Sequence, residues 1–166
     1  MKAIDFDPKL GQAFQGDVSI IPIPDGITIS THDEIKPVDG RLILQEGEVS
    51  GHHHAIDLVR SRQFRPAQVA ADPVLNVRDT SLRKALGGKK APAPTARLYR
   101  DPNVAAQMQS RGILTRSNLT IGVLIVESGP MVVSHEEHDS IRVPEGRYLI
   151  GRQVESAGAE ERVVAD

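Results

Sequence analysis

Short apolar stretches alternate with turn-forming residues along most of the chain. Side chains of a β-strand alternate between two faces, so an alternating run of apolar and polar residues predicts a half-buried strand. Such runs predict strands over 17–24, 26–31, 40–45, 118–127, 131–134 and 141–155. The first of these ends in a Pro-x-Pro pattern, which predicts that it lies at the edge of a sheet.

Two of these runs are separated only by a tight turn. The strand at 118–127 is followed by Ser-Gly-Pro at 128–130 and then by the strand at 131–134. This order predicts an antiparallel hairpin. Within 141–155, Pro-Glu-Gly at 144–146 predicts a turn between two strands.

Segment 96–112 has the spacing of an α-helix. Asp101 is a suitable N-cap, and Pro102 fits the first helical turn. Val104 and Met108 repeat at helical spacing, and Gly112 is placed to end the helix.

The remaining segments predict loops around one domain. Residues 61–97 contain Gly-Gly and repeated prolines and read as a long basic loop insert, with a possible helical turn at 80–86. Residues 1–16 are expected to form an N-terminal arm, and 156–166 a flexible tail. The part between them, 17–155, is then a single mainly β domain: a small β-barrel or sandwich with one short helix.

Composition limits the chemistry. The chain of 166 residues has no cysteine, which excludes disulfides and thiolate metal sites. It has no Trp, two Tyr and three Phe, so its core must consist of Val, Ile and Leu. No apolar run resembles a signal peptide or reaches 18 residues, and we therefore expect a cytoplasmic or virion protein without a membrane partner.

Charge is unevenly distributed. Residues 58–100 hold ten Lys/Arg and two Asp, a net charge of +8, which leaves ten Lys/Arg and twenty Asp/Glu, a net charge of −10, for the rest of the chain. Such asymmetry favours electrostatic association, although a solvated basic loop would have the same composition. The candidate partner-binding residues are Arg83, Lys84, Lys89 and Lys90.

Five of the six histidines fall in two clusters. In the strand expected at 49–59, His52 and His54 would share a face while His53 points away. His135 and His138 lie in a tight loop after another strand. If the two strand ends are neighbours, His52, His54, His135 and His138 could bind zinc or another divalent metal.

The carboxylates of Glu136, Glu137 and Asp139 could orient the ring N–H groups of these histidines. Three other readings stay open: scattered surface histidines, hydrogen bonds at a subunit interface, and a pH-responsive contact.

Catalytic patterns find little support in the sequence. His135-Glu-Glu-His138 has two residues between its histidines, whereas the helical zinc-protease pattern needs three. The chain contains no Gly-x-Ser-x-Gly elbow, phosphate-binding loop or dinucleotide fingerprint. We therefore predict no catalytic residue.

The glycine before His52, the His52/His54 pair and Pro144–Gly146 resemble cupins, small β-barrels that hold a metal on a His-x-His strand and a later histidine. This resemblance implies a His-ligated metalloenzyme acting on a small substrate. The chain departs from the cupin pattern because Asp57 stands too near His54 and no histidine follows Gly146 at the expected place.

A second resemblance covers more of the chain. The motifs Glu46–His54, His135–His138 and Pro144–Gln153 resemble those of a group of small bacterial and bacteriophage proteins of unassigned role. This resemblance implies that the two histidine clusters belong together and that a virion component is a plausible setting. The extra His53 and the basic insert are departures from the group pattern.

These observations favour a non-enzymatic, homo-oligomeric accessory protein, such as a bacteriophage capsid decoration protein. Its expected partners are further copies of itself and a larger assembly such as a capsid. The alternative is a cupin-like metalloenzyme or metal-binding protein. Nucleic-acid binding through 58–100 ranks third, because that segment has few aromatic residues for base stacking.

Overall fold

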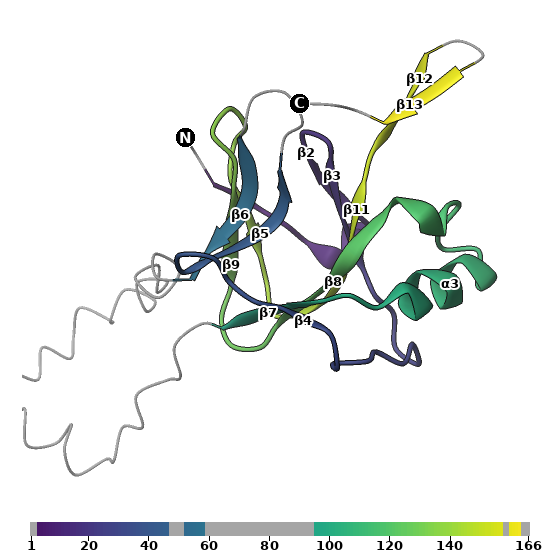
Figure 1. Cartoon of the computed structure of the whole chain (residues 1–166), viewed down its shortest axis with the longest axis horizontal. Coiled ribbons are helices and arrows are strands. Elements are labelled where there is room, and N and C mark those ends of the chain that lie inside the picture. The colour runs from purple at the N-terminus through teal and green to yellow at the C-terminus, as the bar shows by residue number, and fades with distance from the viewer. Residues whose placement is uncertain (1–2, 47–51, 59–94, 158–159, 164–166) are drawn as a thin grey trace, which may run out of the picture.

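The computed structural model describes residues 3–46, 52–58, 95–157 and 160–163. Within them, most of the chain lies in two β-sheets (Figure 1). One sheet has the strand order β1 (Ile4–Asp5), β10 (Ile141–Val143), β9 (Met131–Ser134), β6 (His53–Asp57) and β5 (Arg41–Glu46). The other has the order β2 (Ala13–Gln15), β3 (Val18–Pro22), β11 (Gly146–Arg152), β8 (Thr120–Val126), β7 (Ala96–Tyr99) and β4 (Glu34–Ile35).

The main hydrophobic core draws on both sheets. Alternate side chains of each strand enter it, for example Val18 and Ile20 from β3 and Tyr148 and Ile150 from β11. Leu42, Leu44, Ile56, Met131 and Val133 enter it from the five-stranded sheet. The fold is therefore mainly β, as predicted, and the two sheets are not closed into a barrel. Their arrangement is sandwich-like.

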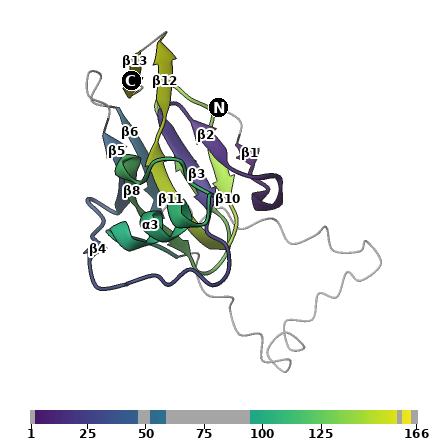
Figure 2. The same ribbon diagram turned by 90° about the vertical axis from the view of Figure 1, so that its right-hand side faces the viewer.

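A second, smaller core lies on the outer face of the six-stranded sheet. Helix α3 (Pro102–Ser110) packs its Val104, Ala105 and Met108 on Val123 and Leu149 of that face (Figure 2). The predicted helix caps are confirmed. The Asp101 carboxylate accepts the Asn103 N–H at 3.1 Å, and Gly112 takes the left-handed φ of 70° just after the helix.

The residues before the N-cap, which the prediction included in the helical segment 96–112, are not helical. Residues 96–99 form β7 instead, because Ala96 and Leu98 are buried in the main core as β7 pairs with β8 and β4. The last residues of the proposed basic insert, 96–97, are therefore part of a sheet. Residues 61–94 of the insert, with the possible helical turn at 80–86, lie outside the described residues.

The strand predicted at 26–31 is wrong, although the segment is ordered by hydrogen bonds. The Thr28 N–H donates to Gln107 Oε1 at 3.2 Å, and Gln107 Nε2 donates to the Thr28 carbonyl at 3.0 Å. The Ser30 N–H donates to the Asp101 carboxylate at 2.6 Å. Helix side chains thus take the place that a partner strand would occupy.

The hairpin predicted over 118–134 is also wrong. Strand β8 pairs with β7 and β11, whereas β9 pairs with β6 and β10 in the other sheet. The turn at 128–130 therefore carries the chain from one sheet to the other.

Both chain ends contribute more structure than expected. In the proposed arm, β1 pairs in parallel with β10, the 3-10 helix η1 (Pro8–Leu10) follows, and β2 pairs with β3. The prediction that 17–24 lies at the edge of a sheet is therefore wrong, because β3 has β2 on one side and β11 on the other. At the border of the proposed flexible tail (156–166), β12 (Val154–Ala157) pairs in antiparallel fashion with β13 (Glu160–Val163). No helix in the described part of the chain is long and apolar enough to cross a membrane.

Candidate functional site

The structure brings the four predicted histidines together. Strands β6 and β9 are neighbours, with Ala55 opposite Ser134, so the residues at their ends meet. The His54 ring stacks on that of His135 with a centroid distance of 4.2 Å, and His135 stacks on His138 at 4.6 Å. His52 lies edge-on to His135 at 5.8 Å. We call the rings of His54, His135 and His138 the histidine stack.

His53 takes another direction, as strand alternation predicts. Its Nε2 atom lies 3.8 Å from Glu46 Oε1 near the surface. Its backbone N–H donates to the Glu136 carboxylate at 2.9 Å, and this hydrogen bond is the main cause of the lowered pKa of Glu136. Glu136 thus binds backbone rather than a histidine ring.

His54 is completely buried and is held on both sides of its ring. Its Nδ1 lies 3.1 Å from Gln15 Oε1, and its Nε2 lies 2.8 Å from Asp17 Oδ1. Gln15 Nε2 donates to the carbonyls of Val133 (3.2 Å) and Asp139 (2.8 Å), which fixes the orientation of the amide. Gln15 Oε1 must then accept, so His54 Nδ1 carries a hydrogen.

The other ring nitrogen of His54 faces Asp17. His54 Nε2 lies 2.8 Å from Asp17 Oδ1, and both side chains are buried. The contact at Oδ1 is close without being aligned as a hydrogen bond. Gln45 Nε2 donates to the other oxygen of Asp17.

This arrangement does not suit the predicted metal centre. Both ring nitrogens of His54 face protein groups, and metal ligation by imidazole requires a nitrogen lone pair directed at the ion in the ring plane. Rings stacked at an interplanar angle of 22° direct their lone pairs side by side instead of toward one point. Among the described residues, no group of three or more His, Asp or Glu side chains could hold a metal ion. The metal-ligand role, with zinc or another divalent ion, stays a prediction that the stack does not support.

The loop carboxylates contribute in different ways. Glu137 Oε1 lies 3.5 Å from His52 Nδ1, in the orienting position predicted for it. The Glu137 N–H donates to His135 Nδ1 at 3.2 Å, which closes the loop on its own histidine. Asp139 acts through its backbone carbonyl, which accepts from Gln15.

Sequence reasoning missed Gln15, Asp17 and Gln45, which are all buried and polar. Gln45 follows the buried Leu44 directly, so alternation would place it outside. A register shift between Ile43 and Gln45 in the β5–β6 pairing turns it inward. Gln15 and Asp17 could have been predicted from their position, because they flank Gly16 directly before a strongly apolar strand.

The histidine stack runs from the core to the surface. His54 is fully buried, His135 is 4% exposed, and the partly exposed His138 lines a hollow of about 420 Å³. The N-terminal segment forms much of its wall, so we call it the N-terminal hollow. Ile4, Leu10 and Phe14 also line it, although they are 56%, 88% and 50% exposed.

The proposed partner-binding residues, Arg83, Lys84, Lys89 and Lys90, lie outside the described residues. Two members of the same basic stretch can be placed. Arg97 lies 3.7 Å from Glu127 and Arg100 lies 3.7 Å from Asp33, so both face carboxylates of their own chain.

Comparison of the chain with protein-family models, with curated proteins and with solved structures finds no match. The function must therefore be argued from the residues themselves.

Proposed function

We propose that the protein is a non-enzymatic component of a protein assembly and that it associates through its N-terminal hollow. The main observation behind this proposal is that three large apolar side chains line the hollow and are at least half exposed: Ile4, Leu10 and Phe14. Contiguous exposed apolar surface is characteristic of protein-interaction sites.

The position of the hollow in the fold supports this proposal. Residues of β1, the outermost strand of the five-stranded sheet, and of β2, the outermost strand of the six-stranded sheet, both line it. Outer strands offer backbone groups with which another chain can pair. An extended segment lying here would contact both sheets.

The partner that we propose is a second copy of this chain. Asp5, Asp7 and Asp139 line the hollow, which favours a partner segment with both basic and apolar residues. Residues 58–100, with a net charge of +8, have this composition. Arg83, Lys84, Lys89 and Lys90 are the cations that we assign to this contact, and added salt should weaken it because exposed charges are screened.

The histidine stack then has a structural role beneath the contact surface. It connects the buried Asp17–His54 pair to the wall of the hollow through His138. A capsid-decoration setting is supported only by the motif resemblance to bacterial and bacteriophage proteins. Association of the purified protein with phage particles would test it.

The experiment compares Leu10→Glu with Val38→Glu in analytical ultracentrifugation over a range of concentrations. Both side chains are strongly exposed (88% and 60%), but only Leu10 lines the hollow. Burying one leucine contributes roughly 1.5–3 kcal/mol, so Leu10→Glu should weaken self-association at least tenfold. Val38→Glu should leave it unchanged. A monomeric wild type, or equal effects of the two substitutions, would refute the proposal.

A further inference from the structure

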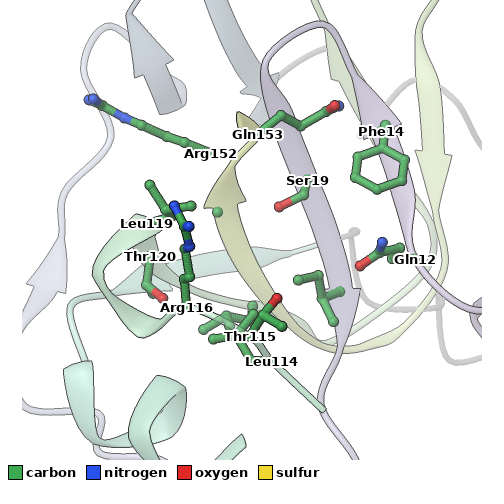
Figure 3. Close-up of a pocket in the computed structure, with 13 residues that line it drawn as sticks. Gln12, Phe14, Ser19, Leu114, Thr115, Arg116, Leu119, Thr120, Arg152 and Gln153 are labelled. Carbon is green, nitrogen blue, oxygen red and sulfur yellow. The ribbon is translucent and has the colours of Figure 1, made fainter. Parts of the chain in front are cut away.

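A second hollow, of about 380 Å³, lies on the outer face of the six-stranded sheet beside the connection from α3 to β8 (Figure 3). We call it the outer-face hollow. Ser19 of β3 and Leu149 of β11 lie on its floor, which continues the face that α3 covers further along. Figure 3 shows Gln12 and Phe14 on one side of Ser19 and Thr120 on the other.

Charge does not define this hollow. None of the described residues that line it is Asp or Glu, and both arginines near it, Arg116 and Arg152, already interact within the protein. Arg152 also pairs with Val18, which faces the main core, and its side chain extends away from the hollow (Figure 3). A ligand must therefore be recognised by the uncharged groups of the lining.

The uncharged polar groups of the lining are hydroxyls and amides. They belong to Gln12, Ser19, Thr115, Thr120 and Gln153. Hydroxyl and amide groups can both donate and accept hydrogen bonds. Ser19 is only 5% exposed, and within the described part of the chain no hydrogen bond engages its hydroxyl, which faces the hollow. Since nearly buried polar groups normally have a partner, this hydroxyl favours a ligand that also donates or accepts hydrogen bonds.

Gly151 leaves room around the Ser19 hydroxyl. A Cβ atom at Gly151 would lie 3.0 Å from Ser19 Oγ and 3.4 Å from the Leu119 carbonyl oxygen. The β8–β11 register shifts between Ile150 and Gly151, at the floor of the hollow. Irregularities of this kind occur frequently beside functional sites.

The Phe14 side chain adds a flat apolar wall. It is 50% exposed, and Phe14 lies opposite Ser19 in the β2–β3 pairing, so the ring and the hydroxyl share one face of the sheet. A pyranose sugar has matching chemistry, because the C–H groups of its ring are apolar and its hydroxyls project around the edge. An aromatic ring beside convergent polar groups can contact both parts.

We propose that the outer-face hollow binds a neutral pyranose sugar. The C–H face of the sugar lies on Phe14, and its hydroxyls exchange hydrogen bonds with Gln12, Ser19 and Thr115. The volume of the hollow is within the range of small-molecule pockets, about 300–1,000 Å³. This inference is independent of the assembly proposal, since the site needs no second copy of the chain.

The test uses the full chain and three probes: methyl β-D-glucopyranoside, N-acetylglucosamine and cyclohexanol. In an NMR chemical-shift titration, at least one of the two sugars should perturb the amides of Ser19 and Gly151. Cyclohexanol keeps a six-membered ring but has a single hydroxyl. It should bind about tenfold more weakly than that sugar, because it leaves most of the polar lining without a partner.

The variant Gln12→Ala/Ser19→Ala should weaken sugar binding about tenfold, because it removes an amide and a hydroxyl from the lining. The fold should tolerate both changes, since Gln12 is exposed and Ser19→Ala removes one oxygen atom. Phe14→Ala should also weaken binding roughly tenfold. Thr31→Ala, which removes an exposed hydroxyl elsewhere, should leave binding unchanged. Absence of sugar-induced shifts, equal binding of cyclohexanol, or unchanged binding by the double variant would overturn the proposal.

Discussion

His54 Nδ1 lies 3.1 Å from Gln15 Oε1, and this contact joins the two sheets. His54 belongs to β6 of the five-stranded sheet and Gln15 to β2 of the six-stranded sheet. Asp17, in the turn between β2 and β3, and Gln45, on β5, repeat the connection a few ångströms away. The histidine pattern that suggests a metal centre in the sequence therefore forms a polar bridge across one end of the fold.

Gln15→Ala should destabilise the protein by roughly 2–4 kcal/mol, because it leaves the His54 N–H, the buried Val133 carbonyl and the partly buried Asp139 carbonyl without this partner. Gln12→Ala is the matched control, because Gln12 is exposed and three residues away, and it should change stability by less than about 0.5 kcal/mol. Urea unfolding followed by circular dichroism measures both. Equal midpoints for the two variants would mean that the bridge contributes little.

His54→Ala should destabilise the protein by about 3–5 kcal/mol, since it removes a fully buried ring and takes one of its partners from the buried Asp17, to which Gln45 still donates. The neighbouring His53→Ala should be nearly neutral, because that ring is at the surface beside Glu46. Thermal unfolding of the two variants distinguishes the loss of a buried ring with polar partners from a general effect of removing a histidine. A larger effect at His53 would contradict the description of the stack.

Zinc and chelators should not change the melting temperature. A metal that binds the folded state raises stability in proportion to its affinity, and His54 cannot ligate one without giving up Gln15 or Asp17. Differential scanning fluorimetry with zinc chloride or EDTA, together with native mass spectrometry, measures this. A bound ion that is lost in His52→Ala and His138→Ala would restore the metal-ligand prediction.

Stability should fall as pH rises from about 10 to 12. Burial raises the pKa of Tyr148 to about 12, above the value of about 10 expected in the unfolded chain. The unfolded state therefore releases this proton first, and the stabilisation present below pH 10 is lost as pH approaches the folded pKa. The loss should be on the order of 2 kcal/mol.

Tyr148→Phe provides the control for this titration. It should lower stability by about 1 kcal/mol at pH 7, because the hydroxyl donates to the Pro144 carbonyl at 3.0 Å. Its unfolding free energy should then fall less than that of the wild type between pH 10 and 12. Parallel pH curves for the two proteins would assign the alkaline loss to other groups.

Local patterns in the sequence predicted the positions of the strands more accurately than they predicted which strands pair with each other. The meeting of His54 with His135 could be predicted because it requires only strand alternation and one neighbouring pair, β6 and β9. The structure of 26–31 could not be predicted in this way. An extended segment has the same sequence pattern whether a neighbouring strand or the Gln107 side chain forms hydrogen bonds with its backbone. The turn at 128–130 likewise carries no information about which sheet the next strand joins.

The buried polar groups illustrate a second limit. Gln45 turns into the core only because the β5–β6 register shifts, and a shift of this kind depends on the partner strand. Asp17 is stabilised by His54 and Gln45, which lie 28 or more positions away in the chain. Distant polar partners of this kind leave no periodic signal, so each residue alone resembles an ordinary turn or strand end.

Phe14 of β2 and the preceding Gln12 line the N-terminal hollow and also the outer-face hollow of the six-stranded sheet. One phenyl ring cannot adopt two positions at once, so a contact that fixes Phe14 in the N-terminal hollow also sets the shape of the outer face. A group bound on either side of Phe14 would change the affinity of the other side, and thermodynamic reciprocity would make the two effects equal. A three-residue strand would in this way connect the proposed contact surface to the opposite side of the sheet.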